Sequence, residues 1–262
     1  MASVWPCRWW ARTRSRASGC TLPAILSTKS RSLFPDGHAW LIVEFGADTQ
    51  EEADAKAHAL AKAFEARKDA PSFKLLEAHE QEEEFWAVRD AGLGSTSKIP
   101  NQPDFYLGWE DSAVDPKDLG DYLRDFQKLM DKYGYKASLY GHFGQGCLHC
   151  SIDFDLYTEP GIEKYRAFVT EAAHLCVKYN GSLSGEHGDG QARGELLPIM
   201  FGDRVVQAMW EFKRIWDPDD KMNPGKVVHP NKLDSNLRWG TQWQPAQPQT
   251  HFTFPEDKNS FV

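Results

Sequence analysis

Long apolar runs, paired cysteine motifs and an excess of positive charge are all lacking from this 262-residue sequence. No apolar run approaches the roughly 20 residues of a membrane-spanning helix, so we expect no transmembrane segment. The formal net charge of −8 argues against nucleic acid as the main partner. The five cysteines are scattered and odd in number, and Cys147-Leu-His-Cys150 has no second CxxC pair to complete a zinc ribbon. We therefore expect a reducing compartment and no disulfide scaffold.

Acidic residues are also missing from the start of the chain, where the first one is Asp36. Residues 1–36 are rich in arginine and serine, a composition typical of an organelle transit peptide. The alternative is a non-native start that precedes the true homologous region, and we favour this second interpretation. We therefore expect one core domain at 37–230. Residues 231–262, which are rich in proline, glutamine and aromatics without periodicity, are expected to form an extended tail.

Two histidines lie on either side of a glycine-interrupted bend in residues 140–155, with the sequence YGHFGQGCLHCSIDFD. The pattern predicts a hairpin with strands at 136–140 and 147–154, joined by a turn at 143–146. In that register His142 pairs with Cys147, and His149 lies diagonally across on the same face, about 7–8 Å away. Imidazoles so placed can converge on one metal ion. The alternative is a hairpin whose histidines only cap its polar face.

Residues 180–194, with the sequence NGSLSGEHGDGQARG, supply a third group. Here Glu186 and His187 stand among glycines, which allow the backbone to approach a ligand or another segment closely. Together His142, His149 and Glu186 form a two-histidine, one-carboxylate set typical of a catalytic metal with an open position. His187 is then available as a base, because imidazole titrates near neutral pH. The alternative is an ordinary solvated turn, and the residue types alone favour neither.

The remaining periodicity predicts strands that alternate with helices. Strands are expected at 38–46, 73–77 and 104–109, and helices at 50–67, 80–92, 115–133, 161–179 and 202–216. The helix at 115–133 should bury Leu119, Leu123, Phe126 and Met130 as one stripe. Antiparallel pairing of two strand–helix–strand halves predicts an α+β fold, an antiparallel sheet with helices on one face and the site on the other.

Three motifs in register, GHFGQGCLH, SGEHGDGQAR and FKRIWDPDDKMNPGKVV, resemble the C-terminal domain of FAD-linked oxidases of the D-lactate dehydrogenase, glycolate oxidase and D-2-hydroxyglutarate dehydrogenase group. GWEDSAV at 108–114 and YGHFGQGC are similar to the long bacterial members, in which a flavoprotein is fused to an iron–sulfur domain. The resemblance covers residues 40–262. It implies the ferredoxin-like substrate domain of vanillyl-alcohol-oxidase type flavoproteins. Cys147 and Ser151 stand where many shorter relatives have asparagine, which affects the geometry of the substrate pocket.

The resemblance also implies roles for single residues. Arg89, in a Trp-x-x-Arg context, would grip the substrate carboxylate, which suits a bidentate guanidinium. A lone helical arginine is more often a solvated or paired surface group. Lys98 would offer a second contact to an anion. Asn223 and Lys226, in an Asn-Pro-Gly-Lys stretch that otherwise predicts a turn, would approach FAD.

No glycine-rich phosphate loop follows a strand in the first 140 residues, and no flavin-binding domain fits before residue 40. The resemblance therefore implies the substrate- and metal-binding half of an FAD-dependent D-2-hydroxyacid dehydrogenase, inactive without its flavin domain. A divalent metal, expected to be zinc, would polarise the substrate, and His187 would take the hydroxyl proton while hydride leaves C2 for the flavin. The implied partners are a small 2-hydroxyacid, an FAD-binding domain in cis or trans, and a 4Fe-4S module outside this chain. We expect a location in the cytoplasm or at the periphery of the inner membrane.

A second hypothesis comes from another class of protein. The chain would be a truncated, non-catalytic metal-binding or interaction domain that keeps the fold but performs no redox step. Bound metal without any rescue by a flavin partner would favour it.

Overall fold

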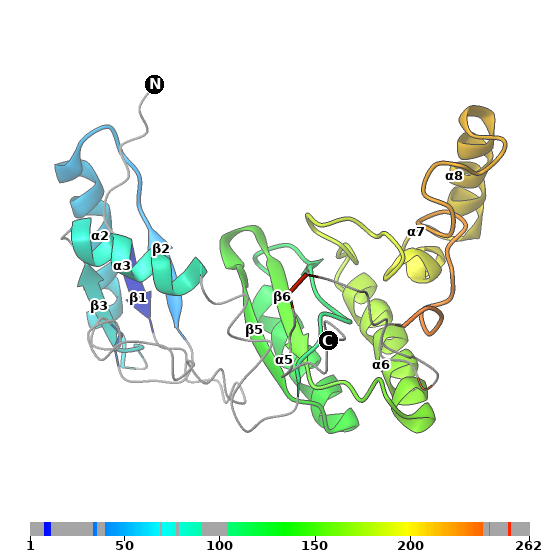
Figure 1. Ribbon diagram of the computed structural model, residues 1–262. Coiled ribbons are helices and arrows are strands. Elements are labelled where there is room, and N and C mark those ends of the chain that lie inside the picture. The colour runs from blue at the N-terminus through cyan, green and yellow to red at the C-terminus, as the bar shows by residue number, and fades with distance from the viewer. Residues whose placement is uncertain are drawn as a thin grey trace. The chain divides into compact units, whose positions relative to one another are not determined.

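The computed structural model describes residues 8–11, 34–35, 40–68, 70–76, 79–90, 104–237, 241 and 251–252 (Figure 1). These residues belong to two compact units. The first unit spans Met1–Leu107, Lys136–Gly141 and His149–Asp153, and the second spans Gly108–Tyr135, His142–Leu148 and Phe154–Val262. Within the described residues, no helix combines the length and apolar character needed to cross a bilayer.

The first unit contains a small antiparallel sheet made by β1 (Arg8–Ala11), β2 (Leu41–Glu44) and β3 (Phe73–Leu76). Its strand order is β2-β1-β3, and β1 is antiparallel to both neighbours. Two helices follow the outer strands, α2 (Gln50–Glu65) and α3 (His79–Asp90). The strands predicted at 38–46 and 73–77 and the helices predicted at 50–67 and 80–92 are confirmed, with bounds that are shorter or shifted by a few residues. The domain boundary at residue 36 stays a prediction, although β1 lies before it.

The N-terminal cap and the alanine spacing of residues 50–65 explain why they form helix α2. Thr49 caps the helix, and its hydroxyl accepts a hydrogen bond of 3.3 Å from the backbone N–H of Glu52. Three alanines at a spacing of four residues, Ala53, Ala57 and Ala61, form the buried stripe. Small side chains on that stripe let the helix approach the sheet closely, and Phe73 and Leu75 of β3 pack against it.

A second three-stranded sheet carries the predicted hairpin. Its order is β4 (Ser112–Ala113), β6 (Cys147–Ile152), β5 (Ala137–His142). The turn between β5 and β6 is a single 3-10 turn, Phe143–Gln145, followed by Gly146. Gly146 has φ of 73°, and an added Cβ would overlap the carbonyl oxygen of Val114, so both backbone freedom and close approach require glycine here. The predicted turn is confirmed. Strand β6, however, is buried along its whole length rather than on alternate residues.

Helices α5 (Leu119–Tyr133) and α6 (Glu159–Lys178) pack against each other in the second unit and are drawn in green shades in Figure 1. Their contact is aromatic, since the rings of Phe126 and Phe168 meet edge to face with centroids 6.1 Å apart. The stripe predicted for α5 is confirmed except at one position, where Tyr122 rather than Leu123 is fully buried. Tyr122 keeps its hydroxyl partnered there by a 2.9 Å hydrogen bond to Ser112.

The rest of the second unit is helical and ends in turns. A 3-10 turn (Gly194–Leu196) leads into the short helix α7 (Leu197–Phe201), and α8 (Asp203–Trp216) follows. The predicted helix at 202–216 is confirmed, whereas α7 has no counterpart among the predictions because five residues show no helical period. The strand predicted at 104–109 is wrong. Only Tyr106 makes a ladder contact there, as an isolated bridge to Ile152, because Gly108 lies in a bend against the ring of Phe154.

Taken together, these elements form a mixed α/β fold with small antiparallel sheets and helices. The predicted fold class is confirmed.

Candidate functional site

Two segments far apart in the sequence meet in the second unit, residues 108–111 and residues 184–193, and we refer to them together as the clasp. Backbone hydrogen bonds at the edge of the clasp bring its two segments together. The N–H of Ala113 donates to the carbonyl of Ser182 at 3.0 Å, and the N–H of Ser182 donates to the carbonyl of Ala113 at 2.8 Å. The N–H of Gly185 then donates to the carbonyl of Asp111 at 2.6 Å. This bridge continues the β4 edge and sets the start of the GEHGDG loop.

The Asp111 side chain lies at the centre of the clasp and is 1% exposed. Its carboxylate accepts hydrogen bonds from the hydroxyl of Ser184 (2.5 Å) and from the backbone N–H groups of Glu186 (3.1 Å) and His187 (2.8 Å). The thiol of Cys147, in β6, donates to it at 3.4 Å. Burial disfavours the ionised carboxyl, but these four donors outweigh that effect and lower the pKa of Asp111. The buried carboxylate is therefore an anion whose charge is shared among its donors.

Arg193 connects the two segments of the clasp in the opposite direction, from residues 184–193 to the backbone of residues 108–111. Its side chain is 4% exposed, and it donates to the carbonyl oxygens of Gly108 (3.2 Å) and Glu110 (2.5 Å). The guanidinium also lies over the ring of Trp109, 4.9 Å from the centroid. Each segment of the clasp thus has one charged side chain that hydrogen-bonds to the backbone of the other segment. This side chain is Asp111 in residues 108–111 and Arg193 in residues 184–193.

His187 lies between two carboxylates. Its Nδ1 is 3.0 Å and 3.1 Å from the two carboxylate oxygens of Glu110, and its Nε2 is 3.4 Å from Glu186. The hydrogen bond with Glu110 raises the pKa of His187, against the smaller opposing effect of partial burial. In the neutral ring, donation from Nδ1 to Glu110 leaves the lone pair on Nε2. His187 is half-exposed, so a substrate can reach that nitrogen.

The predicted metal ligands gather around Glu186. The Nε2 atom of His142 is 3.3 Å from the Glu186 carboxylate, and both side chains are partly exposed. His149 is buried, with its ring 4.9 Å from that of Tyr140 in β5. Potential ligand atoms lie within 4.8 Å of one another in two groups. One comprises Asp111, Cys147, His149 and Glu186, and the other comprises Glu110, His149 and His187. His142 belongs to neither group, so the set His142, His149 and Glu186 stays a prediction.

The donor chemistry of this region fits a divalent cation. Three carboxylates, Glu110, Asp111 and Glu186, lie among histidines, and a cation would offset their mutual repulsion. Imidazole and carboxylate together suit first-row divalent ions such as zinc. Cys147 is a different kind of group here. Burial and the nearby carboxylates, chiefly Asp111, raise the pKa of its thiol to about 12, so it is a protonated donor at neutral pH.

The residues predicted to contact substrate and flavin are less completely described. Arg89 lies at the end of α3, and its side chain is outside the described residues. Lys98 also lies outside the described residues. Asn223 is exposed in a turn with φ of 50°, and Lys226 donates to the side-chain oxygen of Gln191 in the clasp. The Asn-Pro-Gly-Lys turn is therefore connected to the loop that carries Glu186 and His187.

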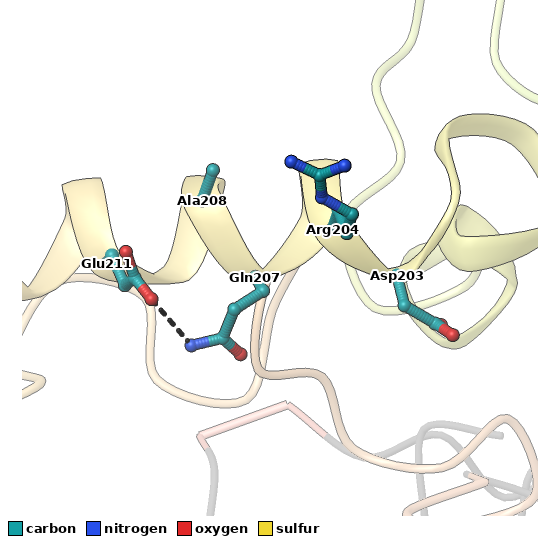
Figure 2. A pocket seen from close by; sticks show the side chains of 5 residues that line it. All are labelled: Asp203, Arg204, Gln207, Ala208 and Glu211. Atoms are coloured by element: carbon teal, nitrogen blue, oxygen red, sulfur yellow. Dashed lines mark hydrogen bonds between the residues drawn. The ribbon is translucent and has the colours of Figure 1, made fainter.

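A shallow hollow on α8 involves none of these residues. It is lined by Asp203, Arg204, Gln207, Ala208 and Glu211 (Figure 2). Gln207 and Glu211 hydrogen-bond to each other at 3.0 Å, one helical turn apart. All five residues come from a single helix face, so the hollow offers no convergent groups for catalysis.

Glu110, Asp111 and Arg193 are functional candidates that the sequence did not single out. All three occur in motifs that were noted for their resemblance alone, GWEDSAV and SGEHGDGQAR. The usable signal was two carboxylates directly after a tryptophan, immediately beyond the strand expected at 104–109. Charged residues are rarely placed in a buried strand unless they are paired, so they pointed to a specific partner elsewhere.

Comparison with known proteins identifies the family of this chain. The family model for the C-terminal domain of FAD linked oxidases matches residues 18–227, and the chain belongs to that family. The chain is 30% identical over 191 residues to a D-2-hydroxyglutarate dehydrogenase of Pseudomonas putida, covering 72% of this chain and 19% of the relative. It is 28% identical over 209 residues to the Escherichia coli protein of that name, covering 75% of this chain and 20% of the relative.

Other relatives have different names. Glycolate oxidase subunit GlcD of Escherichia coli is 28% identical over 197 residues, covering 74% of this chain and 38% of that protein. A mitochondrial D-lactate dehydrogenase [cytochrome] of Arabidopsis thaliana is 25% identical over 166 residues, covering 63% of this chain and 29% of that protein. The chain thus spans about one fifth of the D-2-hydroxyglutarate dehydrogenases it matches. These relatives are oxidoreductases of an FAD-linked family, and their names differ in substrate.

Proposed function

We propose that this chain is the substrate- and metal-binding domain of an FAD-dependent D-2-hydroxyacid dehydrogenase of the D-lactate or D-2-hydroxyglutarate type. The observation that carries the proposal is the position of His187. Its Nδ1 is 3.0 Å from Glu110, its Nε2 is 3.4 Å from Glu186, and Glu186 in turn is 3.3 Å from His142. A base, a carboxylate that orients it and potential metal ligands therefore adjoin one another.

The proposed proton transfer uses the chain's own residues. Glu110 accepts the hydrogen bond from Nδ1–H of His187, which holds the ring in one tautomer and keeps the Nε2 lone pair available. His187 then takes the proton of the substrate C2 hydroxyl on Nε2. The C2–H bond breaks with its electron pair, and the product is a 2-oxoacid. FAD, held by another domain, supplies the acceptor for that hydride when bound.

The metal site is proposed to consist of His142, His149 and Glu186. A bound zinc ion supplies Lewis acidity, polarising the substrate hydroxyl and carboxylate. Two neutral imidazoles and one carboxylate leave at least one coordination position for substrate. The negative charge of Glu110 and Asp111 near these ligands supports a cation at this place.

Other contacts follow from the family resemblance and are proposed here at residue level. Arg89 binds the substrate carboxylate, and Lys98 adds a second cationic contact. Asn223 and Lys226 approach the flavin, and the link between Lys226 and Gln191 supports this by placing the turn beside the clasp. An iron–sulfur module or a quinone outside this chain would serve as the final electron acceptor.

The apolar face of α8 is the surface that we propose to contact the flavin-binding domain. Phe212, Ile215 and Trp216 are 65%, 74% and 76% exposed, and α8 buries none of its residues. Large exposed apolar groups mark an interaction surface rather than a solvated helix. Most of the length of the relatives lies outside the region they share with this chain, so a partner domain is available to cover this face. Asn223 and Lys226 follow α8 directly in the chain.

The proposal is tested by complementation. The full chain is mixed with a separately produced flavin-binding domain of a relative, and reduction of an electron-accepting dye by D-lactate or D-2-hydroxyglutarate is followed with zinc present. We expect activity that depends on both components, and loss of about 100-fold or more with His187→Ala. His174→Ala, on the exposed side of α6, is the matched control and should retain full activity.

Two results would contradict the proposal. Full turnover by His187→Ala excludes that residue as the base. If the chain binds zinc but supports no dye reduction with any flavin domain supplied, the chain is instead a non-catalytic metal-binding or interaction domain.

A further inference from the structure

We propose that Asp111 is a positioning residue whose carboxylate fixes the backbone of Glu186 and His187 and thereby sets the affinity of the site for a divalent cation. The metal half of this inference rests on the proposed function. The positioning half rests on the hydrogen bonds of the clasp alone.

The hydrogen bonds show why Asp111 acts through other residues and not as a ligand. A carboxylate offers about four lone-pair directions. In Asp111 these are used by Ser184 Oγ, the N–H groups of Glu186 and His187, and the thiol of Cys147. A metal at Asp111 would have to displace at least one of these donors and leave it unpaired in a buried place. Asp111 therefore belongs to the support of the site, although its oxygen is within 4.8 Å of possible ligand atoms.

The chemistry of the donors requires a carboxylate at this position. All four donors present N–H, O–H or S–H, and a carboxylate can accept from every one of them. The isosteric amide of asparagine would turn an NH₂ group toward two of these donors. The backbone adds a second restriction, because φ of Asp111 is 71°, a region that aspartate and asparagine enter more readily than most residues.

Fixing the loop at its backbone sets the directions in which the two functional side chains extend. With consecutive N–H groups held on one carboxylate, Glu186 extends toward His142 and His187 extends toward Glu110. Arg193 restrains the opposite segment by binding the carbonyls of Gly108 and Glu110. Ligand and base are thus arranged before a metal or substrate arrives. Mutation of a residue that supports metal ligands in this way typically weakens metal binding by about 10- to 100-fold.

The test compares Asp111→Asn with a matched carboxylate elsewhere. Asp155 accepts the backbone N–H groups of Tyr157 (3.0 Å) and Thr158 (3.2 Å) and the hydroxyl of Thr158 (2.5 Å), so it supports a loop in the same way at the start of α6. Zinc binding to the full 262-residue chain is measured by calorimetry. Amide hydrogen exchange at Glu186 and His187 is measured by NMR in the metal-free chain.

We expect Asp111→Asn to bind zinc about 10- to 100-fold more weakly and to exchange both loop amides faster. Asp155→Asn should leave zinc affinity within about twofold and leave the loop amides unchanged. If Asp111→Asn does not fold, Ser184→Ala removes one donor to the same carboxylate and should weaken zinc binding to a smaller extent, again with faster exchange.

Three results would overturn the inference or part of it. Wild-type zinc affinity in a folded Asp111→Asn chain removes the role of Asp111. Weaker binding with unchanged amide exchange makes Asp111 a ligand instead of a positioning residue. A wild-type chain that binds no divalent cation overturns the proposed function and the metal half together, while faster exchange in Asp111→Asn still supports positioning.

Discussion

The clasp and α8 depart from the usual arrangement of apolar residues inside and charged residues outside, and they do so in opposite senses. The clasp buries an aspartate and an arginine, each less than 5% exposed. Helix α8 exposes Phe212, Ile215 and Trp216, each by more than 60%. Both regions belong to the second unit and follow each other in the chain, separated by α7.

The difference lies in whether the unusual groups already have partners. Asp111 and Arg193 exchange hydrogen bonds with backbone groups of the facing segment, which makes burial of their charges tolerable. The side chains of Phe212 and Trp216 in α8 are instead largely exposed, and their rings contact each other with centroids 6.2 Å apart. The two buried charged side chains of the clasp therefore have partners within the chain, whereas we propose that the exposed face of α8 is covered by the flavin-binding domain. Substitutions in the two regions should consequently affect different quantities.

The largest effect on folding is expected in the clasp. Asp111→Ala leaves two partly buried hydrogen-bond donors of the backbone and the Ser184 hydroxyl without their acceptor, and it should lower the free energy of unfolding by about 3 kcal/mol. Asp155→Ala, which removes an exposed helix-start carboxylate, should cost about 1 kcal/mol. Urea denaturation of both variants measures the difference. Equal losses of unfolding free energy in the two variants would mean that burial of the Asp111 carboxylate adds nothing to stability.

A substitution in helix α8 should have the reverse effect, a small change in stability and a large change in association with the flavin-binding domain. Trp216→Ala is expected to change the free energy of unfolding by less than about 0.5 kcal/mol, because the side chain is exposed. It should weaken association with the flavin-binding domain by about 10-fold or more, as truncation of an interface tryptophan does. Gln207→Ala serves as the control, because a separation of nine residues at 3.6 residues per turn places Gln207 on the opposite side of the helix from Trp216. Sedimentation or calorimetry of the mixed domains gives the affinity, and an unchanged affinity for Trp216→Ala would remove α8 from the interface.

A smaller effect is expected at Gly188, in the GEHGDG loop. Its φ is 93°, and an added Cβ would meet no other atom within 4 Å. Gly188→Ala therefore introduces backbone strain without steric overlap, and it should cost about 1 kcal/mol of stability. Zinc affinity should fall only if the strain reaches Glu186. Thermal unfolding with and without zinc separates the two effects, and a stability unchanged from wild type would show that the loop relaxes freely.

The smallest effect concerns the turn that ends α8. Lys213, with help from the backbone N–H groups of Met222 and Lys221, lowers the pKa of Asp217 to about 2. Because the folded pKa is lowered, the stabilisation is complete above about pH 4 and is lost as the pH falls toward 2. Asp217→Asn should be less stable than wild type at pH 5, with a gap that closes below pH 4. Asp219→Asn, an exposed carboxylate in the same turn, should stay within about 0.5 kcal/mol of wild type at pH 5. A gap independent of pH would contradict the ion pair.

The contrast between the two regions also explains what the sequence could predict. The hairpin turn and the major helices depend on local spacing, and the sequence predicts them directly. The roles of Asp111 and Arg193 depend on a contact between segments more than 70 residues apart, and no periodicity records such a contact. The strand expected at 104–109 fails because Gly108 lies in a bend against the ring of Phe154, a contact between distant residues that no periodicity records. The amphipathic pattern of α8 predicted a helix correctly but not that its apolar face would stay uncovered.

The ligand set is the central claim, and X-ray absorption on the zinc-loaded chain tests it most directly. With His142, His149 and Glu186 as ligands, zinc is surrounded by nitrogen and oxygen at about 2.0–2.2 Å, and His142→Ala and Glu186→Gln each remove one neighbour. A sulfur neighbour at about 2.3 Å that disappears in Cys147→Ser would contradict this set. It would instead place the ion in the group formed by Asp111, Cys147, His149 and Glu186.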